Sequence, residues 1–144
     1  MNDLHGAVAA MLRDAGQRYT RSRRAVVDVL VAAGRPMTLP EILACDAGLS
    51  QSSTYRNLAE LADAGVVRRI VTSDEHAHFE LAEHLTGEHH HHLICSGCGT
   101  VTDFTVPRAL EELIERASAE VARDERFAVD HHQLDLIGRC ERCG

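Results

Sequence analysis

Tryptophan is absent from this sequence of 144 residues, and aromatic side chains make up only 3% of it. Apolar residues reach 44%, which is enough for a packed core but leaves few large side chains to anchor one. Small domains of this kind often depend on metal ions or partner chains for stability. The length allows one domain or two small ones.

A long apolar run is also missing. No stretch approaches the roughly 20 apolar residues that span a bilayer, and the start of the chain has no basic segment followed by an apolar one, as a secretory signal has. We therefore expect a cytoplasmic protein with no membrane partner. Thiols stay reduced in the cytoplasm, so paired cysteines are better interpreted as metal ligands than as disulfides.

Positive charge is scarce overall, since the net charge is −7, but it is unevenly distributed. Residues 1–72 hold nine Arg and seven acids, a balance of +2, whereas residues 73–144 hold six Arg and fifteen acids, a balance of −9. This pattern fits one half that meets a polyanion and another that binds cations. An ordinary solvated surface gives the same pattern, so charge alone does not decide between them.

Hydrophobic periodicity and turn residues predict an α+β chain in two parts. In the first part, residues 1–82, helices are expected over 7–15, 22–33, from Pro36 to near Gly48 and from Ser50 to Gly65, followed by strands over 66–71 and 76–81. Helices followed by a two-stranded ribbon form a winged helix-turn-helix.

The second part of the chain is separated from the first by a polar segment, residues 83–88, which we interpret as a hinge. In residues 89–144, strands are expected up to Cys95, over 100–105 and over about 129–137, with an amphipathic helix over about 107–125. The sequence thus predicts a winged-helix domain joined to a smaller α/β domain.

Two Cys-x-x-Cys pairs provide the least ambiguous motif: Cys95 with Cys98, and Cys140 with Cys143. Each pair presents two thiolates on a tight turn, and two such pairs close a tetrahedral shell around Zn²⁺. A filled four-cysteine shell leaves no position for water or substrate, so this zinc would be structural. Redox dithiols are the competing interpretation, which two pairs in one cytoplasmic chain disfavour. Cys45 lies apart and is expected to be a small core residue.

Histidine is concentrated in one region, because nine of the ten lie between residues 76 and 132 and four are consecutive. Side chains alternate along a strand, so His90 and His92 face one way while His89 and His91 face the other. Four consecutive residues can therefore supply two separate metal sites. The competing interpretation is a solvated polar strand.

Carboxylates near the histidine run can complete one of these sites. Glu80 lies on the preceding strand with His76 and His78 on the same face, and Asp103 on the next strand can face the same cation. Imidazole and carboxylate together suit Fe²⁺, Mn²⁺, Ni²⁺ or Zn²⁺, and the ligand types do not choose among these metals.

Two groups of polar residues are candidates for contact with DNA. One lies in the first turns of a helix that follows a turn, where such side chains reach phosphates and base edges in the major groove. The other is the densest arginine cluster, which can hold backbone phosphates. The candidates are Arg18, Arg21, Arg23, Ser52, Thr54, Tyr55 and Arg56. Each group taken alone is equally compatible with an ordinary polar surface.

Several stretches together resemble the ferric uptake regulator (Fur) superfamily. They are residues 19–24 (YTRSRR), 53–58 (STYRNL), 79–81 (FEL) and 89–99 (HHHHLICSGCG), with His132 eight residues before Cys140. The resemblance covers about residues 8–144. It implies a homodimer in which each chain has an N-terminal winged-helix domain and a C-terminal α/β dimerisation domain.

The resemblance also implies the ligands of two further metal sites. The interdomain sensing site of the family corresponds to Glu80, His90, His92 and Asp103. Its second site corresponds to His89, His91, His132 and a helix glutamate, for which Glu111 is the first choice and Glu112 and Glu115 are alternatives.

Three positions depart from the family pattern. Many members take a sensing ligand from the position of Pro36, and zinc-uptake members often have a cysteine where this chain has Ala82 and an acidic or histidine ligand near Arg68. His76 or His78 can substitute for the missing ligand. The lack of a cysteine favours Fe²⁺ or Mn²⁺ over Zn²⁺ as the regulatory metal without excluding zinc.

The leading hypothesis is therefore a metal-dependent repressor that binds a palindromic DNA operator as a homodimer. A peroxide sensor of the same family, in which bound iron drives oxidation of a histidine ligand, is the first alternative. A zinc hydrolase needs an open coordination position and a general base, and no His-Glu-x-x-His helix is present to provide them. A metal-storage module is a further alternative, but it needs no DNA-binding half.

Overall fold

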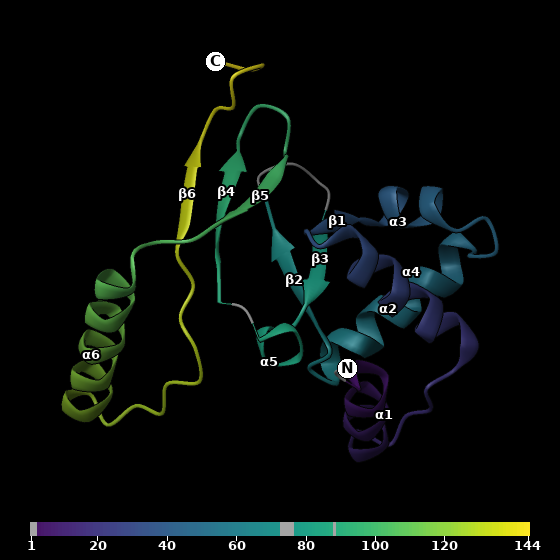
Figure 1. Ribbon diagram of the computed structural model, residues 1–144, viewed down its shortest axis with the longest axis horizontal. Helices are drawn as coiled ribbons and strands as arrows, with labels where there is room; N and C mark the ends of the chain where they lie inside the picture. The colour runs from purple at the N-terminus through teal and green to yellow at the C-terminus, as the bar shows by residue number, and fades with distance from the viewer. Residues whose placement is uncertain (1–2, 73–76, 88) are drawn as a thin grey trace.

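The computed structural model describes residues 3–72, 77–87 and 89–144, which form two three-stranded sheets and the helices around them. Helices α1 to α4 lie together at one side of the molecule, the long helix α6 stands at the opposite side, and both sheets lie between them (Figure 1). The first sheet has the strand order β1-β3-β2, and the second has the order β5-β4-β6.

The N-terminal half contains the helices of the predicted winged helix-turn-helix. Their bounds are α1 Leu4–Asp14, α2 Arg21–Ala33, α3 Leu39–Cys45 and α4 Gln51–Asp63. Thr20 caps α2 by accepting a hydrogen bond from the Arg23 amide, and Ser50 caps α4 in the same way. Gly34 ends α2 in the left-handed region, with φ of 61°, which glycine adopts without steric cost.

The wing is a three-stranded sheet and not the two-stranded ribbon predicted from the sequence. Its strands are β1 Met37–Thr38, β2 Val67–Val71 and β3 Ala77–Leu81, and both β1 and β2 pair antiparallel with β3. The short strand β1 was missed because two residues carry no periodicity. It is held by the pairing of Met37 with Phe79, and the Met37 side chain is buried.

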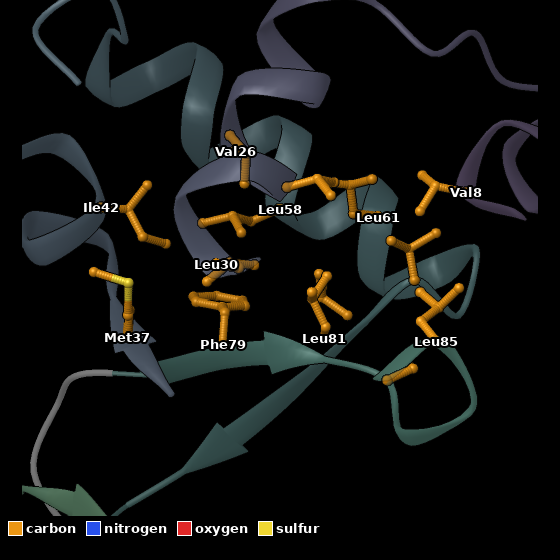
Figure 2. Close-up of a cluster of buried hydrophobic side chains, with 14 of the residues drawn as sticks. Val8, Val26, Leu30, Met37, Ile42, Leu58, Leu61, Phe79, Leu81 and Leu85 are labelled. Carbon is orange, nitrogen blue, oxygen red and sulfur yellow. The ribbon is translucent and has the colours of Figure 1, made fainter. Parts of the chain in front are cut away.

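The main hydrophobic core lies between the helices and one face of this sheet. Figure 2 shows side chains of α2 and α4 meeting Phe79 and Leu81 of β3, as the alternation along that strand predicts. Val8 of α1 and Leu85 of α5 (Glu83–Thr86) close the same core at one end. Because α5 packs here, the segment predicted as a hinge begins with one turn of helix attached to the winged-helix half.

The C-terminal half contains β4 His91–Cys95, β5 Val101–Phe104, α6 Arg108–Asp124 and β6 Asp135–Gly138. Strand β4 is central, pairing antiparallel with β5 and parallel with β6. The last strand is shorter than the predicted 129–137 and begins only at Asp135. A small apolar cluster of Ile70 from β2 with Ile94 and Val101 joins the two sheets.

Helix α6 buries no side chain within the chain, although its sequence is strongly amphipathic. Leu113 and Val121 on α6, like Leu136 and Ile137 on β6, are exposed. Helix α6 and the edge strand β6 therefore both leave apolar side chains exposed in the single chain.

Candidate metal centres and DNA-binding surface

Three groups of metal-binding side chains converge within the described part of the chain. Each group offers four ligand atoms that lie within 4.8 Å of one another. They are the cysteine cluster (Cys95, Cys98, Cys140 and Cys143), the interdomain cluster (Glu80, His90, His92 and Asp103) and the C-terminal cluster (His89, His91, Glu111 and His132). All twelve residues were candidates from the sequence, and the structure brings each set of four together, while their roles as metal ligands stay predictions.

The cysteine cluster joins the end of β4 to the end of the chain. The Sγ atoms of Cys98 and Cys140 are 3.7 Å apart, and the Cys140 amide donates to Cys95 Sγ over 3.3 Å. Backbone N–H donors from Cys140 and Cys98 lower the pKa of the Cys95 thiol to about 6, which favours the thiolate that zinc requires. At Gly97, an added Cβ would lie 2.8 Å from Cys143 Cβ, so only glycine lets the two turns approach.

This donor set fits a structural zinc ion. Four thiolates from two tight turns supply a closed tetrahedral shell, and none of the other metal-binding groups reaches into it. Cys45 was expected in the core, but it is exposed at the end of α3, because the apolar face of that short helix is used by Ile42. Cys45 therefore takes no part in either the core or this cluster.

The interdomain cluster brings together residues from both halves of the chain. Glu80 comes from β3 of the wing. His90 directly precedes β4, His92 lies on β4, and Asp103 lies on β5. Nε2 of His90 and Nε2 of His92 each lie 2.9 Å from one oxygen of Glu80. The carboxylate of Asp103 lies 3.4 Å from His90 and 3.6 Å from His92. Four donor atoms thus surround one point at the boundary between the sheets.

Burial and mutual charge shift the pKa values of this cluster. Burial raises the pKa of Glu80, but the hydrogen bonds and charges of His92 and His90 lower it by more, so it lies below its usual value. Burial lowers the pKa of His92, whereas Glu80 and Asp103 raise it by more. Burial raises the pKa of Asp103. The raised pKa of His92 means that a proton competes more strongly with a metal ion for this imidazole than for a free one.

Of the two proposed substitute ligands, the structure describes only His78, which is not part of this group. His76 lies outside the described residues. His78 shares the face of Glu80, but the ring is buried beside Thr38 and Cys98, where it lines a separate hollow. His78 is not among the four residues whose ligand atoms converge at the point where Glu80, His90 and His92 meet. His78 therefore supplies no ligand atom to this cluster in this conformation, and its role as a substitute ligand stays a prediction.

The C-terminal cluster lies on the opposite face of the histidine run. The carboxylate of Glu111, in the first turn of α6, contacts His91 and lies 3.1 Å from Nε2 of His89. Nε2 of His132 is 3.1 Å from Nε2 of His89. The alternatives Glu112 and Glu115 are exposed, and Glu112 pairs with Arg108 instead. Glu111 is therefore the helix glutamate that the fold places here.

The DNA-binding candidates divide into exposed and buried groups. Arg18, Arg21, Ser52, Tyr55 and Arg56 are exposed. Tyr55 is 60% exposed, whereas Asn57 on the same helix is buried.

Two candidates have structural roles instead. Thr54 is 1% exposed and cannot reach DNA in this conformation, because it faces the core side of α4. The guanidinium of Arg23 joins α2 to α4: its Nε donates to Asn57 over 3.1 Å, and it also contacts Glu60. Arg23 therefore holds the helix that carries Tyr55 and Arg56 rather than presenting a free charge.

Three charged residues near the clusters were missed as functional candidates from the sequence. Arg68 pairs with Glu80 in the β2–β3 register, Glu83 lies 2.8 Å from Nδ1 of His89, and Asp135 lies 3.5 Å from Nδ1 of His92. The hairpin register could have identified Arg68, because residues directly opposite on antiparallel strands interact. The positions of Glu83 and Asp135 depend on how distant segments pack, which no local pattern reveals.

No helix in the described residues has both the length and the apolar character needed to cross a membrane. The model of the ferric uptake regulator family matches residues 14–137. The chain is 33% identical over 138 residues to the peroxide-responsive repressor PerR of Staphylococcus aureus (strain USA300), covering 93% of this chain and 87% of the relative.

Solved structures of the same family share the fold. The ferric uptake regulator Fur of Vibrio cholerae superposes with a TM-score of 0.68 at 30% identity, covering 91% of this chain and 98% of the other. Fur of Helicobacter pylori, described with three functional metal binding sites, gives a TM-score of 0.71 at 26% identity, covering 97% and 91%. These matches confirm the expected combination of a winged-helix domain and a dimerisation domain. The chain belongs to the ferric uptake regulator family.

Proposed function

We propose that this protein is a transcriptional repressor that binds a palindromic operator as a homodimer when a divalent metal occupies the interdomain cluster. The observation that carries the proposal is the origin of the four ligand atoms, since Glu80 belongs to the wing whereas His90, His92 and Asp103 belong to the C-terminal sheet. A cation held by all four ties the two domains together. Its role is then regulatory and not enzymatic.

Metal binding acts on DNA binding through the orientation of the winged helices. Helix α4 presents Tyr55 and Arg56, and Arg23 fixes α4 to α2 so that the domain moves as one body. Half-sites on DNA lie about 34–36 Å apart, so a dimer binds tightly only when its two domains are spaced to match. A metal that favours the matching arrangement shifts the population toward it.

The dimer in this proposal forms through the C-terminal domain. Exposed apolar residues on α6 and β6, Leu113, Val121 and Ile137 among them, supply the face that a second copy covers. In this scheme the hinge lies within the predicted segment 83–88 but after α5, and the cysteine cluster holds a structural Zn²⁺ that keeps the ends of β4 and β6 together. Fe²⁺, Mn²⁺ and Zn²⁺ are the candidate regulatory metals because all three suit imidazole and carboxylate ligands. For manganese, one relative of known structure is Fur from Pseudomonas aeruginosa with manganese.

Operator binding measured against metal concentration tests the proposal. We expect Fe²⁺, Mn²⁺ or Zn²⁺ to raise operator affinity of the zinc-loaded protein by about 5- to 150-fold, the usual range of allosteric coupling. Glu80→Ala should abolish that increase, because the wing then loses its ligand, while His90 and His92 still bind metal more weakly. Glu112→Ala, on the exposed face of α6, is the control and should behave as the unmodified protein. Metal-dependent binding that survives Glu80→Ala would refute the proposal.

Peroxide sensing is a second candidate, favoured by one structural feature. A cavity of about 740 Å³ beside α1 and α2 reaches Glu80, His90 and Asp103 but not the buried His92. A small oxidant can therefore approach a metal in the interdomain cluster from the side of His90. Mass spectrometry of iron-loaded protein treated with hydrogen peroxide should then find an added oxygen on His90. Unmodified histidines together with unchanged operator binding would exclude this function.

A further inference from the structure

We propose that Arg68 and Glu83 couple the two histidine clusters, so that metal binding at the interdomain cluster raises the metal affinity of the C-terminal cluster. The proposal rests on the proposed function, because it takes both clusters to be metal sites. Neither residue offers a ligand atom to either cluster. Both lie between the clusters, on β2 and α5.

A continuous series of charged contacts joins the clusters through these two side chains. Nη1 of Arg68 lies 3.9 Å from Oε1 of Glu80 and 3.4 Å from Oε1 of Glu83. The other oxygen of Glu83 lies 2.8 Å from Nδ1 of His89. The series therefore begins at a ligand of the interdomain cluster and ends at a ligand of the C-terminal cluster.

Glu83 positions His89 for metal binding. Nε2 of His89 faces Glu111 and His132, each at 3.1 Å, so this nitrogen is the one aimed into the C-terminal cluster. With Nδ1 donating to Glu83, the neutral imidazole keeps its lone pair on Nε2. A carboxylate behind a ligating histidine fixes its ring and tautomer, and removal of such a partner typically costs 10- to 100-fold in metal affinity.

Arg68 is shared between the two carboxylates. It stands opposite Glu80 in the hairpin register, and its side chain is only 20% exposed, so its charge is screened less than that of a surface arginine. While the interdomain cluster holds no cation, Glu80 and Glu83 compete for the same guanidinium. When a divalent cation balances the charge of Glu80, that competition ends and Arg68 pairs with Glu83 alone.

A firmer pair between Arg68 and Glu83 restricts the motion of Glu83, and Glu83 in turn orients His89. The second metal then binds a site whose ligand is already in place, so the coupling is positive. By thermodynamic linkage, metal at the C-terminal cluster raises the affinity of the interdomain cluster by the same factor. We expect a factor of about fivefold or more, the lower end of allosteric couplings.

Co²⁺ titration of the zinc-loaded full-length protein, followed by visible absorption, tests this. The variants His92→Ala and His132→Ala disable one cluster each, which assigns the absorption of the other. The affinity of the C-terminal cluster should fall by about fivefold or more when His92→Ala disables the interdomain cluster. In an Arg68→Ala background, adding His92→Ala should leave this affinity unchanged, which a double-mutant cycle measures directly.

Two further variants separate positioning from charge. Glu83→Gln keeps an acceptor for Nδ1 of His89, so the Co²⁺ spectrum of the C-terminal cluster should be retained while the coupling is lost. Glu83→Ala should weaken that cluster by about 10-fold or more. Arg69→Ala, an exposed arginine on the same strand, is the matched control and should keep the full coupling.

The outcomes distinguish this inference from the function on which it rests. Equal affinity of the C-terminal cluster in the unmodified and His92→Ala proteins would overturn the coupling and leave metal-dependent repression intact. Coupling that persists in Arg68→Ala would overturn the assigned route. Absence of Co²⁺ from both clusters would overturn the coupling and the sensing function together.

Discussion

Removal of the structural zinc should unfold the C-terminal domain while the winged-helix domain stays folded. The perturbation is Cys98→Ser, which deletes one thiolate of the cysteine cluster, or extraction of zinc from the unmodified protein by a chelator. The two domains should respond differently because their cores differ in size. Fifteen buried side chains form the core around α1 to α5, among the residues that the structure describes.

The magnitude follows from what holds the C-terminal domain together. The structure describes all of residues 91–144, and the buried aliphatic side chains among them are Ile94 and Val101. At about 1.5–3 kcal/mol each, they contribute about 3–6 kcal/mol. A structural zinc ion supplies about 10–16 kcal/mol of apparent binding free energy at neutral pH. Loss of the metal therefore removes more stabilisation than apolar burial within the chain provides.

Hydrogen exchange read peptide by peptide, with zinc content measured in parallel, is the suitable assay. Amides of β4 and β6 should lose protection in the Cys98→Ser protein, whereas those of α2 and α4 keep theirs. Cys45→Ser is the matched control, because Cys45 is exposed and is not one of the four clustered cysteines, and it should retain both zinc and protection. Continued protection of β4 and β6 in zinc-free protein would refute the reasoning.

Three other substitutions test single contacts. Gly97→Ala should lower zinc content, measured by elemental analysis, because its Cβ would meet Cys143 Sγ at 3.0 Å; a full zinc complement would show that the turns can separate. Arg23→Ala should lower the free energy of unfolding in urea by about 1.5–3 kcal/mol, the worth of a hydrogen bond to a charged group; an unchanged midpoint would contradict its role between α2 and α4. Tyr55→Ala should weaken operator binding in fluorescence anisotropy without changing the melting temperature, since this side chain is exposed; unchanged affinity would remove Tyr55 from the DNA surface.

Where sequence reasoning failed, the error lay in side chains whose environment depends on distant segments. Thr54 and Arg23 carry residue types suited to DNA, but one faces the core and the other pairs across two helices. Cys45 was expected inside and lies outside, because helical periodicity fixes the relative positions of side chains but does not say where the buried stripe ends.

The sequence by itself determined which residues form each metal cluster wherever local chain geometry sufficed. A Cys-x-x-Cys turn presents two thiolates together in almost any fold, and strand alternation alone separates His90 and His92 from His89 and His91. Only the tertiary structure decided that Glu111, and not Glu112 or Glu115, completes the C-terminal cluster, because that choice depends on how α6 docks. It also placed Arg68 and Glu83 between the clusters, since contacts among a wing strand, a hinge helix and a histidine run arise only when the two domains pack together.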